Sequence, residues 1–159
     1  MLALLVAGCT SGEPAGRAGT AASAGTAIRP GDLKALAAAY LAVAKPANRR
    51  LDTENDGFSD EEHGDLAAAE SDLRAEAATE RRFDQQLSTI GFPPQIAVPV
   101  QALIQANARR ITLTLRQARS SSVSGLLSFA HRHQAADAAV EAQVKVVRRD
   151  LGLPPPADS

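Results

Sequence analysis

Alanine is the feature of this sequence that most limits how the chain can fold. Hydrophobic residues make up 45% of the 159 positions, but 33 of them are alanines. Only five residues are aromatic and tryptophan is absent, so little of the large side-chain material that builds a sheet remains. The composition therefore predicts an all-α fold, and the length suits one domain.

The charged residues are balanced in number but unevenly placed. Seventeen basic and 18 acidic residues give a net charge of −1, which argues against a dedicated nucleic-acid binder. Residues 52–84 hold 12 of the acids, whereas residues 100–150 hold eight basic residues. We expect the acidic segment to pair with the basic one, which sets orientation more than stability. The arginine doublets, Arg109-Arg110 among them, are interpreted as solvated helix faces.

A four-residue motif, Val6-Ala7-Gly8-Cys9, closes the apolar run at the N-terminus. Cys9 is the only cysteine, and polar residues follow it at once. The motif resembles the lipobox of bacterial lipoproteins, which implies cleavage before Cys9 and acylation of its sulfur and freed amine. The resemblance implies a protein anchored in the cell membrane on its extracytoplasmic side, with the lipid bilayer as a partner.

The segments around the motif predict a leader and a tether. A signal peptide has a basic start and an apolar core of about 7–15 residues. Residues 1–8 lack both, so we interpret them as the remnant of a signal peptide whose start lies upstream. The alternative is an apolar N-terminus with an incidental free thiol. The Gly, Ala, Ser and Thr that follow predict that residues 9–31 are the lipidated cysteine and a flexible, disordered tether.

Helical periodicity begins after the tether and continues to residue 152. Pro46 should kink or end the first helix, and Gly152 should end the last one, before a Pro-rich tail over residues 153–159. Long helices joined by short turns predict an up-down antiparallel four-helix bundle over residues 32–152. The expected helices cover residues 32 to about 51, 59 or 60 to about 90, 94 to 119, and 123 to about 151.

An acidic stretch between the first two expected helices is predicted to be a loop over residues 52–60. Its alternating carboxylates before a glycine resemble the first half of an EF-hand-type calcium loop. The resemblance implies oxygen ligands from Asp52, Glu54, Asp56, the carbonyl of Phe58, and Asp60. His63 stands where the twelfth position of such a loop carries a Glu. The alternative is a solvated acidic turn whose side chains cap a helix.

Polar residues interrupt the apolar stripes of three expected helices at one level. Glu76 and Glu80 do so on the second helix, Asn107 on the third, and His133 and Asp137 on the fourth. If the bundle is antiparallel, these residues share one layer, which suits a metal–carboxylate site or an acid–base centre. The alternatives are a hydrogen-bonded layer that fixes helix register, or side chains at the boundary or surface.

No nucleophile motif or phosphate-binding glycine loop occurs in the sequence. The first hypothesis is therefore an exported, membrane-anchored lipoprotein with a non-catalytic binding or envelope-structural domain. Its partner would be an envelope protein or polymer. The second is a calcium-binding module in the acidic loop, and the third is a metal or acid–base site in the polar layer.

Overall fold

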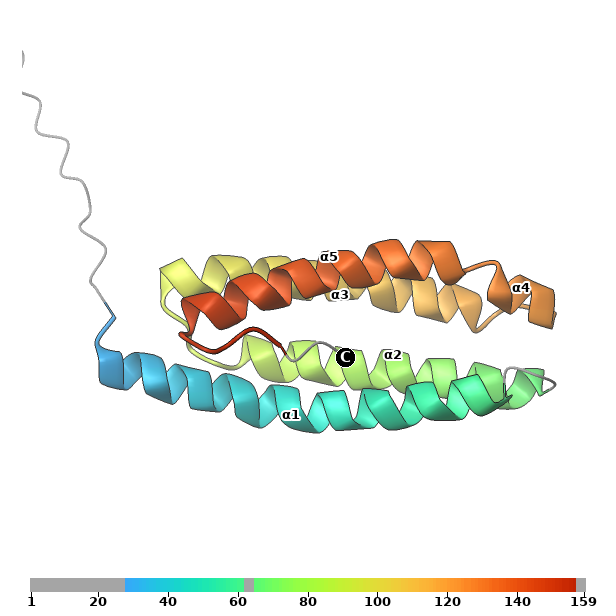
Figure 1. Cartoon of the computed structure of the whole chain (residues 1–159), viewed down its shortest axis with the longest axis horizontal. Coiled ribbons are helices and arrows are strands. Elements are labelled where there is room, and N and C mark those ends of the chain that lie inside the picture. Colours follow the sequence, from blue (N-terminus) through green and yellow to red (C-terminus); the bar gives the residue numbers. More distant parts are fainter. Residues whose placement is uncertain (1–27, 62–64, 157–159) are drawn as a thin grey trace, which may run out of the picture.

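A computed structural model of the protein describes residues 28–61 and 65–156, apart from the side chains of residues 55–61 (Figure 1). Every regular element in this part is a helix, which confirms the all-α prediction. The lipobox, Cys9, most of the tether and residues 157–159 lie outside the described residues. The elements are α1 (Pro30–Glu61), α2 (Leu66–Ser88), α3 (Pro94–Gln117), α4 (Val123–Leu127) and α5 (Ala130–Asp150).

The helices form an elongated body of two layers (Figure 1). One layer holds α1 beside α2, and the other holds α3 beside α5. The layers join mainly where α2 packs on α3. Within the described residues α1 and α5 share no comparably extensive contact, so the edge between them is the open edge of the body.

Helix α1 does not end at Pro46, and it corrects the predicted end near residue 51 because it continues to Glu61. Pro46 is exposed and removes only its own N–H, while Ala44 and Ala47 beside it are buried. The loop predicted over residues 52–60 is wrong, since these residues are helical. Packing against α2 overrides the loop-forming composition here, and Glu54 accepts a 2.9 Å hydrogen bond from Thr79 of α2.

The other helix boundaries follow local capping. Helix α2 begins at Leu66 and not at residue 59 or 60, because Asp65 is its N-cap and accepts hydrogen bonds from the N–H groups of Ala67 and Ala68. Helix α3 matches its prediction to within two residues. Gly152 follows α5 with φ +67°, as expected of a residue that ends a helix.

The last predicted helix is broken into α4 and α5. Ser122 caps α4 through the Gly125 N–H, as the sequence predicts. The Ser128 hydroxyl then donates to the Gly125 carbonyl at 2.7 Å and ends α4, and the chain turns through Ser128 and Phe129. The break lets Leu126 be buried against α2 and the end of α3.

Two apolar clusters hold the body together. The larger one joins α1, α2, α3 and α5 and includes Tyr40, which is only 2% exposed. The smaller one surrounds Leu126 near α4. Many buried positions are alanines, which lets the helices approach closely. The larger cluster is made of Ala37, Tyr40, Ala44, Leu87, Ile96, Val100, Leu103, Val147 and Leu151.

None of the helices in the described residues is both long and apolar enough to cross a membrane.

Candidate functional site

Three of the predicted polar residues converge on a single cation, Arg110 of α3. Its Nη1 lies 2.6 Å from Glu76 Oε1 and also contacts Glu80 Oε1, both from α2. Its Nε lies 2.5 Å from Asp137 Oδ1 of α5. The expectation that the Arg109-Arg110 doublet is solvated is therefore wrong for Arg110, whose side chain is only 20% exposed.

Glu80 is the most deeply buried member of this Arg110 cluster, with a side chain 4% exposed. Burial raises its pKa to about 7, and the charge of Arg110 only partly opposes that effect, while Glu76 adds to it. Burial likewise raises the pKa of Glu76. Burial alone would lower the pKa of Arg110, but the carboxylates outweigh it and hold that pKa above its usual value. Arg110 therefore keeps its charge, whereas Glu80 exchanges its proton near neutral pH.

Asn107 lies one turn before Arg110 and binds a different carboxylate. Its Nδ2 donates to Asp84 Oδ1 at 3.0 Å. Burial raises the pKa of Asp84 to about 6, and the Asn107 hydrogen bond opposes that shift. Asp84 extends the set of carboxylates along α2 by one turn beyond Glu80.

His133 lies beside the cluster and faces Phe129, with ring centroids 6.5 Å apart. Burial and the charge of Arg110 lower its pKa, and Asp137 opposes them. Its Nε2 is buried without a hydrogen-bond partner among the described residues. The structure thus joins Glu76, Glu80 and Asp137, places Asn107 next to them, and leaves His133 outside the ion-pair network.

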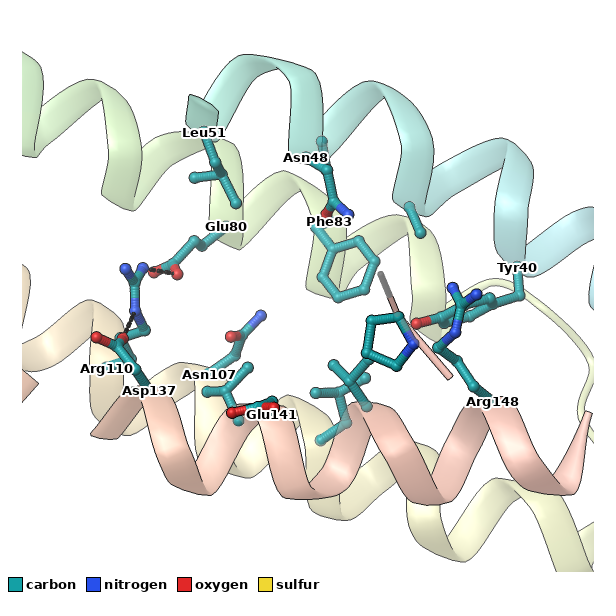
Figure 2. A pocket seen from close by; sticks show the side chains of 16 residues that line it. Tyr40, Asn48, Leu51, Glu80, Phe83, Asn107, Arg110, Asp137, Glu141 and Arg148 are labelled. Atoms are coloured by element: carbon teal, nitrogen blue, oxygen red, sulfur yellow. Dashed lines mark hydrogen bonds and ion pairs between the residues drawn. The ribbon is translucent and has the colours of Figure 1, made fainter. Parts of the chain in front are cut away.

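A pocket of about 270 Å³ lies between the two layers at the open edge between α1 and α5. Glu80, Arg110 and Asp137 lie at one end of it, and Tyr40 and Arg148 lie at the other (Figure 2). Asn107 also lines it, so the pocket connects three of the five predicted polar residues. The remaining lining is largely apolar and includes Ala44, Leu51, Phe83, Leu103, Val140 and Val144.

The C-terminal segment returns toward this pocket after α5 (Figure 1). Leu153 packs against the larger apolar cluster, and Arg148 Nε donates to the Pro154 carbonyl at 2.7 Å. Pro156 contributes to the pocket wall. The part of the Pro-rich tail that the structure describes is therefore packed against the body and completes its site.

The predicted calcium ligands do not lie in a loop. Residues 52–60 are helical, and alternate side chains on a helix point about 200° apart, so the wrapped geometry of an EF-hand-type loop is not formed. Asp52 is exposed and Glu54 binds Thr79. The side chains of Asp56, Phe58 and Asp60, and the whole of His63, lie outside the described residues. Within the described part, no three His, Cys, Asp or Glu side chains are grouped to hold a metal ion.

Sequence reasoning missed Arg110, Asp84 and Arg148 as parts of the site. Arg110 could have been found from Glu76 and Glu80, because two carboxylates on an inward face require a nearby cation. Arg110 is the basic residue that borders the apolar stripe of α3 at that level. Comparisons with protein-family models, with curated proteins and with solved structures find no match to this chain. The site must therefore be interpreted from its own chemistry.

Proposed function

We propose that this protein is an exported lipoprotein, anchored through acylated Cys9, whose helical domain has a non-catalytic binding role. The binding site in this proposal is the pocket between α1 and α5. The pocket is the observation that carries it, because it combines a largely apolar wall with charged groups at both ends. Small-molecule sites have this character. The pocket volume of about 270 Å³ lies close to the lower limit of such sites, about 300 Å³, so the pocket suits a small ligand.

The proposal treats the domain as an up-down antiparallel four-helix bundle whose four members are α1, α2, α3 and α5. Its support is that helices consecutive along the chain, α1 with α2 and α2 with α3, make extensive contacts. The connection from α2 to α3 is only residues 89–93, which favours antiparallel neighbours. In such a bundle the first and last helices, here α1 and α5, are also neighbours. Because their contact is limited in this protein, a space for a ligand remains between them.

Support for the anchor comes from the lipobox residues Val6-Ala7-Gly8-Cys9. The test is metabolic labelling with a fatty-acid analogue in bacterial cells that express the protein from its natural start. We expect labelling of the wild-type protein and none of Cys9→Ala. A Cys9→Ala protein that still takes up the analogue would contradict the anchor.

The binding site is tested on the purified full chain with Cys9→Ser, which changes no described residue. Hexanol and hexylamine serve as small probes with apolar bodies, and calorimetry measures their binding. We expect saturable binding of at least one probe, which Val144→Phe abolishes because a larger side chain fills the pocket. Val98→Phe is the matched control, since Val98 is 72% exposed and does not line the pocket.

Val140→Phe is a second filling variant in case Val144→Phe fails to fold. Circular dichroism verifies that each variant keeps its helices. If neither these probes nor hexanoate binds to the Cys9→Ser chain, the proposed binding function is wrong. It is equally wrong if a folded filling variant binds the probes as tightly as the Val98→Phe control.

A further inference from the structure

One carboxylate oxygen in the pocket wall has no partner. Glu80 Oε1 contacts Arg110, but Glu80 Oε2 is buried and accepts no hydrogen bond from any described residue. A buried acceptor left unpaired destabilises the folded protein, and more so if it is charged. Glu80 lines the pocket, and Figure 2 places its carboxylate at the end of the pocket beside Arg110. A ligand that supplies a hydrogen-bond donor at this end would remove that cost.

The charges at this end favour a cationic donor. Three carboxylates, Glu76, Glu80 and Asp137, share the single guanidinium of Arg110. The amide of Asn107 is already directed to Asp84, so it does not serve Glu80. Glu141 adds a further carboxylate to the wall, and it pairs with Lys145 at 2.5 Å. The Arg110 cluster thus carries an excess of negative charge whenever its carboxylates are ionised.

We propose that the pocket binds a small organic amine whose ammonium group donates to Glu80 Oε2 and whose apolar body lies along the pocket wall. The inference rests on the proposed function, because it presupposes that the pocket binds a ligand. Phe83 and Leu51 lie on the α1–α2 side of the pocket and Val140 lines its wall on α5. The ring of Phe83 also suits a neighbouring cation, since an aromatic face attracts positive charge.

A carboxylate ligand would be repelled at this end by the excess of acids. It would have to place its head at the opposite end, near Arg148 and Tyr40 (Figure 2). Arg148 would meet the head group there through its Nη groups, since its Nε donates to the Pro154 carbonyl, and the Tyr40 side chain is almost fully buried. The unpaired acceptor of Glu80 would remain unpaired. The structure therefore favours the amine over an acid of the same size.

The test compares hexylamine, hexanol and hexanoate on the purified full chain with Cys9→Ser at neutral pH, by calorimetry. The three probes share an apolar body and differ in the head group. We expect hexylamine to bind at least about tenfold more tightly than hexanol, the ratio that a charge-assisted hydrogen bond supplies, and hexanoate to bind most weakly. Glu80→Gln should reduce the preference for hexylamine over hexanol to less than about threefold, because only the ionised carboxylate forms the charge-assisted hydrogen bond.

Glu70→Gln is the matched control, because Glu70 lies on the same helix, pairs with Arg74 and does not line the pocket. It should keep the preference for the amine. A protein that binds hexylamine and hexanol equally, or hexanoate best, overturns the amine proposal while the proposed binding function stands. Failure of all three probes to bind refutes the binding function itself, so the two failures are distinguishable.

A second measurement needs no variant. An ammonium group beside Glu80 favours the ionised carboxylate, so binding of hexylamine near neutral pH should release a proton from Glu80 to the buffer. Calorimetry in two buffers of different ionisation enthalpy measures that proton. Hexanol should release none. Hexylamine binding without proton release would contradict the placement of the ammonium at Glu80.

Discussion

The buried carboxylate of Glu80 predicts an unusual dependence of stability on pH, which Glu80→Gln should remove. Burial raises the pKa of Glu80 from 4.5 to about 7. The folded protein therefore holds this proton more tightly than the unfolded chain does. Between pH about 4.5 and about 7, the free energy of unfolding falls as pH rises, because Glu80 must ionise while it is buried. Above pH about 7 this loss of stability is complete.

The magnitude follows from the two pKa values. One pKa unit corresponds to about 1.4 kcal/mol, so the difference between 4.5 and about 7 amounts to roughly 3 kcal/mol. No discount for solvent screening is needed, because the Glu80 side chain is only 4% exposed. Glutamine has nearly the same shape and does not ionise. The Glu80→Gln protein should therefore lose roughly 3 kcal/mol less than the wild type between pH about 5 and about 8.

Urea unfolding at the two pH values, followed by circular dichroism, measures this difference. Comparing the two proteins cancels the contributions of the other titratable groups. Glu70→Gln is the control, and because the Glu70 side chain is 40% exposed and pairs only with Arg74 of its own helix, the variant should follow the wild type at both pH values. Equal pH dependence of wild type and Glu80→Gln would refute the reasoning, as would a wild-type protein that gains stability relative to the variant as pH rises.

Three further substitutions test individual features of the fold. Arg110→Met should lower the free energy of unfolding at pH about 8 by about 3 kcal/mol, because Glu76 and Glu80 lose their cation. Arg109→Met, at the exposed neighbour, should change it by less than about 0.5 kcal/mol in the same urea assay. Pro46→Ala should raise the unfolding free energy by about 1 kcal/mol or more, since it restores a donor inside α1, and a lower urea midpoint would contradict the continuous helix. Gly152→Ala should cost about 1 kcal/mol because φ is +67° there, whereas Gly31→Ala should leave the melting temperature nearly unchanged.

Much of the fold is encoded in local patterns. The apolar stripes that predict the second and third helices contain Leu73, Leu87, Val100 and Leu103, and all four are buried. These predictions succeed because burial of one helix face needs only the sequence of that helix. The helix boundaries were less predictable, because the course of α1 beyond Pro46 depends on its packing against α2. Tertiary contact outweighs loop-forming composition at that point.

The candidate site likewise has a part that the sequence predicts, the inward carboxylates, and a part that it does not, the pocket. Helical spacing alone places Glu76 and Glu80 on an inward face, and the structure brings both to Arg110. The pocket itself could not be predicted, because it arises where α1 and α5 fail to pack closely and Pro156 returns to line the gap. Such a feature is a property of the packed body and has no local pattern.

The central claim is that the pocket between α1 and α5 receives a small ligand at Glu80. The most direct measurement is methyl NMR of the full chain with Cys9→Ser during a titration with hexylamine. The account predicts shifts at the methyl groups of Leu51, Leu103, Val140 and Val144, which line the pocket, and none at Leu73 and Leu126 in the smaller apolar cluster. Pocket methyl signals that stay in place, or shifts of equal size at Leu126, would contradict it.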